Sequence, residues 1–377
     1  IPGTLDTVIL SNNGFDVTIP TGIAASCATL EIGVTGTNSA ESLIFSSATS
    51  SLSVNGNVIV YGPSRSNDRD IALNTGTMTV GGNLELGTGQ TGDNSNRRSR
   101  LIITTGTMTV SGNLTFNNVN GSDPAQTQII MSGAATFNLG GAFTISNGSG
   151  TLSPGTSSTF NFNGSAAQTI PIGVSNVDYN NLNINNTHPS GATISAAIST
   201  ANVTGNIKIE TGTLNNGGFA IVGGSSDAFS VSDDALLNLS GTSTFPTGFG
   251  TTTLEATSTV NYNGTNQNVA NKSYGNLVLS TSGNKTFAGT TTIAGNLTLS
   301  GTAIAILSNG TTSTAASLNF SGVYQAATSW GGSGSSATNK NSTKFGTTTS
   351  GIINNGNSCS SAAISGGTTV CSGNNST

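Results

Sequence analysis

Hydrophobic and polar residues alternate along most of the chain, in short runs separated by glycine and asparagine. The stretch TGTMTVGGNLEL at 75–86 is typical, because Met78, Val80 and Leu84 share one side of the pattern while their neighbours are polar or small. A period of two residues is what a β-strand with one buried face requires. Helical periodicity is nowhere comparable, so the pattern predicts an all-β chain.

The pattern returns at intervals of about thirty residues. TGTMTVSGNLTF at 105–116 nearly repeats the stretch at 75–86, and shorter versions end at residues 60, 145, 209 and 299. One such unit cannot bury its own apolar side, so successive units must stack around a shared column of aliphatic side chains. We therefore expect a right-handed parallel β-helix over residues 1–320, with the hand given by the usual crossover preference. An array of β-sandwich domains is the alternative, but it does not explain the short unit.

A second, longer internal repeat is superimposed on the short one. The segment at 158–184 matches the segment at 258–279, with Gly164 equivalent to Gly264. The bends of the short unit often carry a Gly-Asn pair, and both residue types tolerate positive φ. Asparagines at equivalent corners of a stack can also hydrogen-bond to one another. We predict a structural ladder of five corner asparagines: Asn57, Asn83, Asn113, Asn206 and Asn296.

Composition narrows the classes of partner. Only 7% of the 377 residues are charged, and the net charge of −5 offers no basic surface for a phosphate backbone, so we expect no nucleic-acid partner. No apolar run approaches the ~18–20 residues that span a bilayer, so we expect no direct membrane insertion. We expect no cofactor and no metal site, because His188 and three scattered cysteines do not provide tetrahedral zinc spacing.

The charged residues gather in one region. Superposing the two similar stretches places Asp68 over Arg98 and Asp70 over Arg100, which predicts inter-coil ion pairs on an exposed loop. A carbohydrate-binding or carbohydrate-cleaving cleft that acts on acidic polysaccharide is the alternative, although no second acid or aromatic platform accompanies the cluster. Its ligand-binding candidates are the five arginines, Arg65, Arg69, Arg97, Arg98 and Arg100.

Two further features carry hypotheses. Outward threonines such as Thr77 and Thr107 resemble the face of β-helical ice-binding proteins, although we expect the rank to stop after Phe116. Threonine is also a common exposed strand residue, so this similarity is weak by itself. Near the end of the chain, Cys359 and Cys371 are candidates for a short disulfide loop in an oxidising compartment.

The segments STVNYNGTNQNVANKSYGNLVLS and NKTFAGTTTIAGNLTLSG, followed by residues 324–352, resemble segments of large secreted and cell-surface proteins of Bacteroidetes. Such proteins are typically exported by the type IX secretion system, and some serve as adhesins. The resemblance implies an extracellular protein and suggests O-glycosylation at Thr7 within Asp-Thr-Val. The tail at 356–377 resembles a linker or the beginning of an immunoglobulin-like β-sandwich repeat.

Residues 321–355 are expected to cap the β-helix, with Trp330 either in that cap or serving as a sugar platform. The function that we expect is a non-enzymatic structural or adhesive shaft of a secreted bacterial cell-surface protein. Its partners would be an extracellular surface or glycan, and other copies of itself in a filament. The alternatives are the carbohydrate-active protein described above and then an ice-binding surface.

Overall fold

The computed structural model describes residues 3–11, 14–89, 96–117, 126–148, 150–174 and 176–356, with the backbone of two short strands beyond residue 361. The chain divides into two compact units, which are described separately. Unit 1 comprises Ile1–Leu214, Ile221–Phe229 and Thr247–Thr252, and unit 2 comprises Asn215–Ala220, Ser230–Pro246 and Thr253–Thr377.

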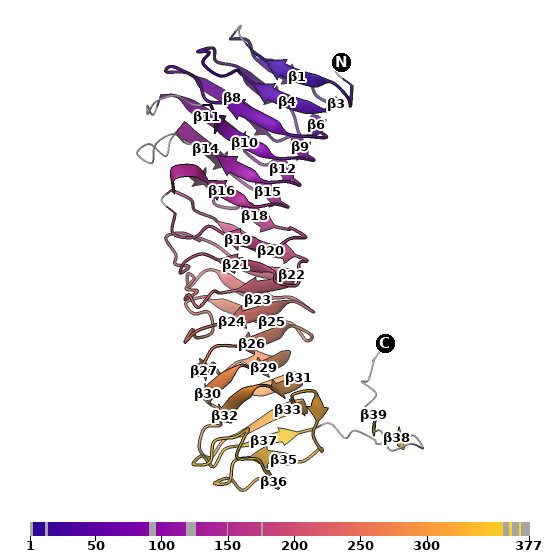
Figure 1. Ribbon diagram of the computed structural model, residues 1–377, viewed down its shortest axis with the longest axis vertical. Helices are drawn as coiled ribbons and strands as arrows, with labels where there is room; N and C mark the ends of the chain where they lie inside the picture. The colour runs from indigo at the N-terminus through magenta and orange to yellow at the C-terminus, as the bar shows by residue number, and fades with distance from the viewer. Residues whose placement is uncertain are drawn as a thin grey trace. The chain divides into compact units, whose positions relative to one another are not determined.

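Unit 1 is a parallel β-helix in which each of the first coils contributes one strand to each of three sheets (Figure 1). Sheet 1 stacks β1 (Thr7–Leu10), β4 (Thr29–Ile32), β7 (Val58–Tyr61), β10 (Leu84–Thr88), β13 (Leu114–Phe116) and β16 (Phe143–Ile145). Sheet 2 stacks β2 (Val17–Ile19), β5 (Ser42–Phe45), β8 (Asp68–Asn74), β11 (Arg98–Ile103), β14 (Thr127–Met131) and β17 (Thr151–Ser153). Sheet 3 stacks β3 (Ala24–Cys27), β6 (Ser51–Val54), β9 (Thr77–Val80), β12 (Thr107–Val110), β15 (Thr136–Leu139), β18 (Thr159–Phe162), β20 (Asn181–Asn186) and β22 (Ile207–Asn215).

The core of unit 1 consists of inward columns of apolar side chains. Met78 and Met108 lie opposite each other on β9 and β12, as the repeat predicts. The same column of sheet 3 continues through buried residues of the neighbouring strands, namely Leu52, Phe137, Phe160 and Leu182. Burying such side chains is the main term that stabilises a stack whose single coils have no core of their own. The prediction of an all-β parallel solenoid is confirmed.

Shorter elements complete unit 1. The 3-10 helix η2 (Ser146–Gly148) follows β16, and β19 (Gln168–Ile170) pairs in parallel with β21 (Ala192–Ile194). Farther along the chain are β23 (Ala228–Val231) and β25 (Thr251–Leu254).

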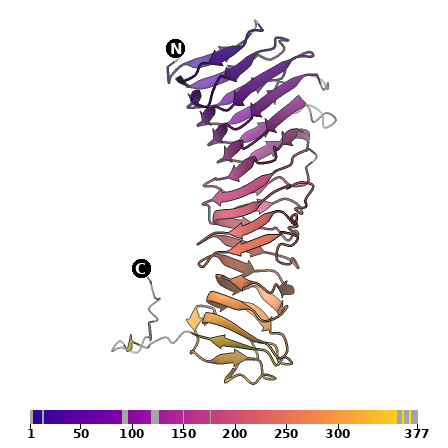
Figure 2. The ribbon, with the colours of Figure 1, turned by 180° about the vertical axis from the view of Figure 1, so that it is seen from behind.

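Unit 2 is also built from parallel strands (Figure 2). One stack contains β24 (Leu236–Leu239), β26 (Thr259–Tyr262), β29 (Asn276–Leu279), β31 (Thr292–Leu299) and β33 (Thr312–Phe320). A second stack contains β27 (Gln267–Val269), β30 (Ser282–Phe287) and β32 (Thr302–Ile306), and the two-residue β28 (Ser273–Tyr274) pairs with β31.

A buried glutamine closes one corner in each unit and explains the longer repeat. Gln168 accepts a hydrogen bond from the Gly164 N–H at 2.9 Å and donates to the Leu139 carbonyl at 2.9 Å. In unit 2, Gln267 accepts from the Gly264 N–H at 2.8 Å and donates to the Leu239 carbonyl at 2.7 Å. Because a buried main-chain group needs a partner, the glutamine amide replaces strand pairing at the bend.

The parallel pairing changes after β33, which ends at Phe320. The next strand, β34 (Val323–Tyr324), pairs antiparallel with β33, and β35 (Ser329–Gly331) pairs antiparallel with β37 (Ile352–Asn355) and parallel with β36 (Asn339–Lys340). This change in pairing falls where the cap was expected to begin. Farther on, β38 (Ala362–Ala363) and β39 (Thr369–Val370) form an antiparallel pair.

Candidate functional site

The charged cluster lies on sheet 2, where β8 and β11 run side by side. Asp68 is opposite Arg98 and Asp70 is opposite Arg100, as the sequence predicts. Arg100 Nη2 lies 2.7 Å from Asp70 Oδ2 and 2.8 Å from Asp68 Oδ2, and Arg98 Nε lies 3.7 Å from Asp68 Oδ1. The hydrogen bond to Asp70 and the charges of both aspartates raise the pKa of Arg100 above its usual value, although burial opposes them. The carboxylates therefore bind arginines of the neighbouring coil.

Two expectations for this cluster were wrong. The ion pairs lie on paired strands rather than on an exposed loop. Arg69 is not available to a ligand, because its side chain is fully buried between sheets 1 and 2 and packs where Gly33 leaves room for it. Its guanidinium lies 3.1 Å from the Glu41 carboxylate, which is itself only 2% exposed. It also donates to main-chain carbonyls, including those of Tyr61 and Gly62 at 3.2 Å each.

The other two arginines flank the cluster. Arg65 is exposed in the turn before β8, and Arg97 is half-buried beside β11. Asn67, Asp68 and Arg98 contribute to a shallow hollow of about 410 Å³ on this side of unit 1. Among the described residues, no group of three or more His, Cys, Asp or Glu side chains is placed to hold a metal ion. The ion pairs hold neighbouring coils together, and the hollow beside them is a shallow polar surface.

The corner asparagines form hydrogen-bonded ladders. Asn57 Oδ1 accepts the Asn83 N–H at 2.8 Å, Asn83 Oδ1 accepts the Asn113 N–H at 2.9 Å, and Asn113 Oδ1 accepts the Ala142 N–H at 2.8 Å. The other two candidates belong to separate short runs. The Asn206 N–H donates to Asn181 Oδ1, and Asn206 Oδ1 accepts from the Ala228 N–H. The Asn296 N–H donates to Asn276 Oδ1, and Asn296 Oδ1 accepts from the Ser317 hydroxyl.

The Gly-Asn pairs were attributed to a need for positive φ, and this explanation was wrong. None of the five corner asparagines has a positive φ, and neither do their glycine neighbours. The glycines are needed because the coils approach closely: a Cβ at Gly82 would collide with Asn57 Oδ1, and one at Gly112 would lie 2.5 Å from Asn83 Oδ1. The side-chain oxygen that builds the ladder thus occupies the space that a glycine leaves on the next coil.

A second surface was only partly recognised in the sequence. Along β6, β9, β12, β15, β18 and β20, one outward column of sheet 3 contains Ser51, Thr77, Thr107, Thr136, Thr159 and Asn181. The neighbouring column contains Ser53, Thr79, Thr109, Asn138, Asn161 and Asn183. We call these two columns the hydroxyl–amide face. The expectation that the threonines stop after Phe116 was wrong for the first column, which Thr136 and Thr159 continue, and right for the second, where Asn138 follows Thr109.

A small polar hollow borders this face. It has a volume of about 230 Å³ and is lined by residues that include Thr109, Ser111, Asn163 and Ser165. Apart from Val110, its lining residues carry hydroxyl or amide side chains or are glycine, and none of them is charged.

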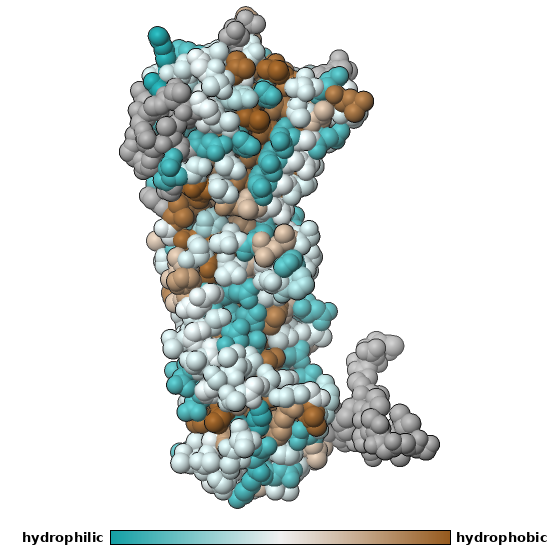
Figure 3. Space-filling view, in the orientation of Figure 1, coloured by the Kyte–Doolittle hydropathy of each residue, from teal (hydrophilic) through white to brown (hydrophobic). Residues whose placement is uncertain are grey.

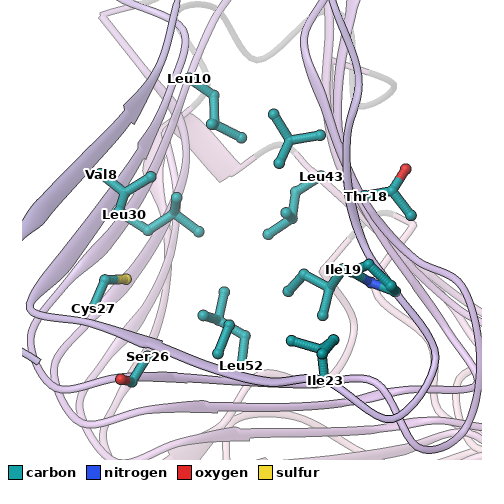
Figure 4. A pocket seen from close by; sticks show the side chains of 13 residues that line it. Val8, Leu10, Thr18, Ile19, Ile23, Ser26, Cys27, Leu30, Leu43 and Leu52 are labelled. Atoms are coloured by element: carbon teal, nitrogen blue, oxygen red, sulfur yellow. The ribbon is translucent and has the colours of Figure 1, made fainter. Parts of the chain in front are cut away.

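The end of unit 1 at β1, β2 and β3 is apolar and open (Figure 4). Leu10, Ile19, Leu43 and Leu52 point into a hollow of about 200 Å³ there. Figure 3 shows hydrophobic atoms at this N-terminal end. The exposed large hydrophobic residues of the first coil are Leu5, Ile9, Phe15, Val17 and Ile23. Among the residues that the structure describes, no strand pairs with the outer edges of β1, β2 and β3.

Trp330 lies in the region that was expected to form the cap. Its indole Nε1 donates to the Ala326 carbonyl at 3.0 Å, and its ring meets Phe320 edge to face at 5.4 Å between centroids. Phe345 is buried, and its ring also meets the Phe320 ring edge to face. Thr7, the glycosylation candidate, is exposed on β1 and accepts a hydrogen bond from Thr29 Oγ1 at 3.0 Å. The disulfide candidates Cys359 and Cys371 lie outside the described residues.

Comparisons with protein-family models, with curated proteins and with solved structures find no significant match. Within the described residues, no helix is long and apolar enough to cross a membrane. The functional argument therefore depends on the geometry of the two units.

Proposed function

We propose that this chain is a non-enzymatic structural and adhesive shaft of a secreted bacterial cell-surface protein. The observation that carries the proposal is the use of polar side chains in unit 1. Asp68 and Asp70 contact Arg98 and Arg100 across a coil boundary, and corner asparagines such as Asn83 bridge successive coils. Groups that could serve chemistry are thus engaged in holding one coil to the next.

A stack of this kind suits a mechanical role. Every strand of sheet 3 between β6 and β20 is hydrogen-bonded to neighbours on both sides, so main-chain groups are protected from proteases and from water. The resemblance to Bacteroidetes surface proteins supports export by the type IX system. Association with other copies of the chain in a filament is part of the same proposal.

A carbohydrate-cleaving activity on acidic polysaccharide is the second candidate. It is favoured by the concentration of arginines on one side of unit 1, beside the hollow that Asn67 and Arg98 line. Hydrolysis of a glycosidic bond generally needs one carboxyl to donate a proton and another to act as base or nucleophile. Asp68 and Asp70 are both engaged in ion pairs with Arg98 and Arg100, so neither carboxylate is free to approach a substrate.

The test combines a resistance assay with an activity assay on the full chain. We expect the protein to survive protease concentrations that digest an ordinary globular control, and to release no reducing ends from acidic polysaccharides. If reducing ends are released and this activity is lost in Arg100→Ala, the carbohydrate-cleaving function is favoured and the non-enzymatic shaft is contradicted. Rapid digestion within 14–89 would contradict the mechanical role even without any activity.

A further inference from the structure

The hydroxyl–amide face has a composition that the other two sheets of unit 1 do not share. Each of its six strands contributes two outward side chains to the two columns, and all of them are Ser, Thr or Asn. The outward positions of sheets 1 and 2 include large apolar and charged side chains, for example Ile59, Glu85, Asp70 and Ile130. The uniformity is confined to the six strands from β6 to β20, because the adjoining strands of sheet 3 present Ala24 on β3 and Lys208 on β22 in the same columns.

The same face is also geometrically regular. Neighbouring strands of a sheet lie about 4.8 Å apart, and alternate residues on one strand lie about 6.6 Å apart. The register between β6 and β20 has no shift over the two columns, so their hydroxyl and amide groups form a two-dimensional grid. Threonine has few side-chain rotamers, so groups such as Thr77 and Thr107 are fixed before any ligand arrives.

Several polar atoms of the grid have no partner among the described residues. The hydroxyls of Thr77, Thr107 and Thr136 take part in no side-chain hydrogen bond there. In the second column, Asn161 donates to Asn138 Oδ1 at 2.7 Å, but its own Oδ1 is buried and unpartnered within that part of the chain. A buried polar oxygen without a protein partner is usually satisfied by an ordered water.

We propose that the hydroxyl–amide face binds ice, so that the surface of crystalline water is what the shaft adheres to. This inference rests on the proposed adhesive function and names its ligand. A hydroxyl both donates and accepts, as each water of a lattice does, and a rigid grid can meet many lattice waters at once. A neutral glycan fits less well, because sugar rings usually stack on an aromatic side chain and none of the grid positions is aromatic.

The substitution that tests the face is Thr107→Lys, at the centre of the first column. Thr107 is half-buried and points outward, so a longer side chain can extend into water without disturbing the core. The matched control is Thr115→Lys on sheet 1, which adds the same charge at a half-buried outward position of β13. An ammonium is strongly hydrated and would disturb an ordered water layer around it. This disturbance should lower binding only on the face that contacts ice.

The experiment freezes polycrystalline ice slowly from a solution of the full chain and measures the fraction of protein that enters the ice. We expect the wild type and Thr115→Lys to be enriched several-fold over a non-binding control protein, and Thr107→Lys to fall to the level of that control. Both variants should keep the wild-type melting temperature and circular dichroism spectrum. Equal partitioning of Thr107→Lys and Thr115→Lys would overturn the proposal, and so would a wild type that stays in the liquid.

A parallel measurement separates this inference from the function on which it rests. The same three proteins are mixed with insoluble cellulose and chitin. Retention of the wild type there, lost in Thr107→Lys but without any entry into ice, would replace ice by a neutral glycan and leave the adhesive function standing. Failure on all of these surfaces, with protease resistance intact, would overturn the ice proposal and leave only the structural part of the shaft.

Discussion

The strongest test of the packing argument is Arg69→Met. The wild-type guanidinium is fully buried, and its nitrogens donate to Glu41, to Thr37 and to main-chain carbonyls including those of Tyr61 and Gly62. Methionine keeps much of the length of the side chain but removes the charge and every donor. The substitution therefore removes the ion pair between Arg69 and the buried Glu41 carboxylate.

The expected loss can be estimated from these contacts. Removing one partner of a buried ion pair costs about 3–5 kcal/mol. Each carbonyl that loses its donor away from water adds roughly 1–3 kcal/mol. We therefore expect Arg69→Met to destabilise the second to fourth coils by at least about 3 kcal/mol, which corresponds to a roughly hundredfold fall in hydrogen-exchange protection.

Hydrogen exchange followed by mass spectrometry is the suitable assay, because a solenoid can open coil by coil and need not unfold in one step. Arg65→Met is the matched control, since Arg65 is exposed and should change stability by less than about 0.5 kcal/mol. The double variant Arg69→Met with Glu41→Leu removes the stranded charge and should recover part of the loss. The reasoning would be refuted by an Arg69→Met effect below about 1 kcal/mol, or by a double variant no more protected than the single one.

Three other substitutions test separate contacts. Burial lowers the pKa of Lys285 from 10.5 to about 8, so the unfolded chain binds more protons between those values, and stability should rise with pH across that window. The rise should be at most about 3 kcal/mol, vanish in Lys285→Met and be visible by urea titration of Trp330 fluorescence; a pH-independent wild type would contradict it. Asn83→Ala should cost about 1 kcal/mol and lower exchange protection at its own corner, whereas loss of protection only in unit 2 would disagree. Arg100→Ala should cost about 1.5–3 kcal/mol in dilute buffer and less in 1 M salt, and an effect independent of salt would speak against the ion pair with Asp70.

The register of the coils was predictable from the sequence because it follows from strand parity and a repeat. Once Met78 is placed over Met108, Asp68 must lie over Arg98 and Asp70 over Arg100. Both steps need only alternation and an offset of 30 residues, and the structure confirms them. The periodicity thus determined which coil contacts which.

The burial of Arg69 was also encoded in parity, but it was missed. Arg69 shares its side of β8 with Ile71 and Leu73, both fully buried, and Glu41 likewise lies two residues before the buried Leu43. The expectation that a guanidinium stays exposed outweighed that signal. Arg69 occupies an inward position of the alternating pattern, and the oppositely charged Glu41 occupies an inward position one coil earlier. Two opposite charges at such positions would have identified the buried pair.

The role of the bend glycines could not be read from the sequence. It depends on how closely Gly82 approaches Asn57 across coils, and this distance is set by the packing of both coils. The extent of the hydroxyl–amide face was hidden for another reason. Similarity to TGTMTV fades after the fourth coil, whereas the parity of Thr136 and Thr159 persists, and parity decides which face a side chain joins.

The three sheets of unit 1 bury similar side chains but expose different ones, and this contrast bears on function. Inside the stack, Leu, Met and Phe succeed one another within a single column, as expected where volume and apolarity are the only requirements. A plain spacer would place similarly weak constraints on all of its outer surfaces, and each would carry a mixture of polar, charged and apolar residues. Sheets 1 and 2 have that mixture, whereas six successive strands of sheet 3 expose only hydroxyl and amide side chains. A purely mechanical role would account for two faces of unit 1, whereas the uniform stretch of the third is what the proposed binding of ice would explain.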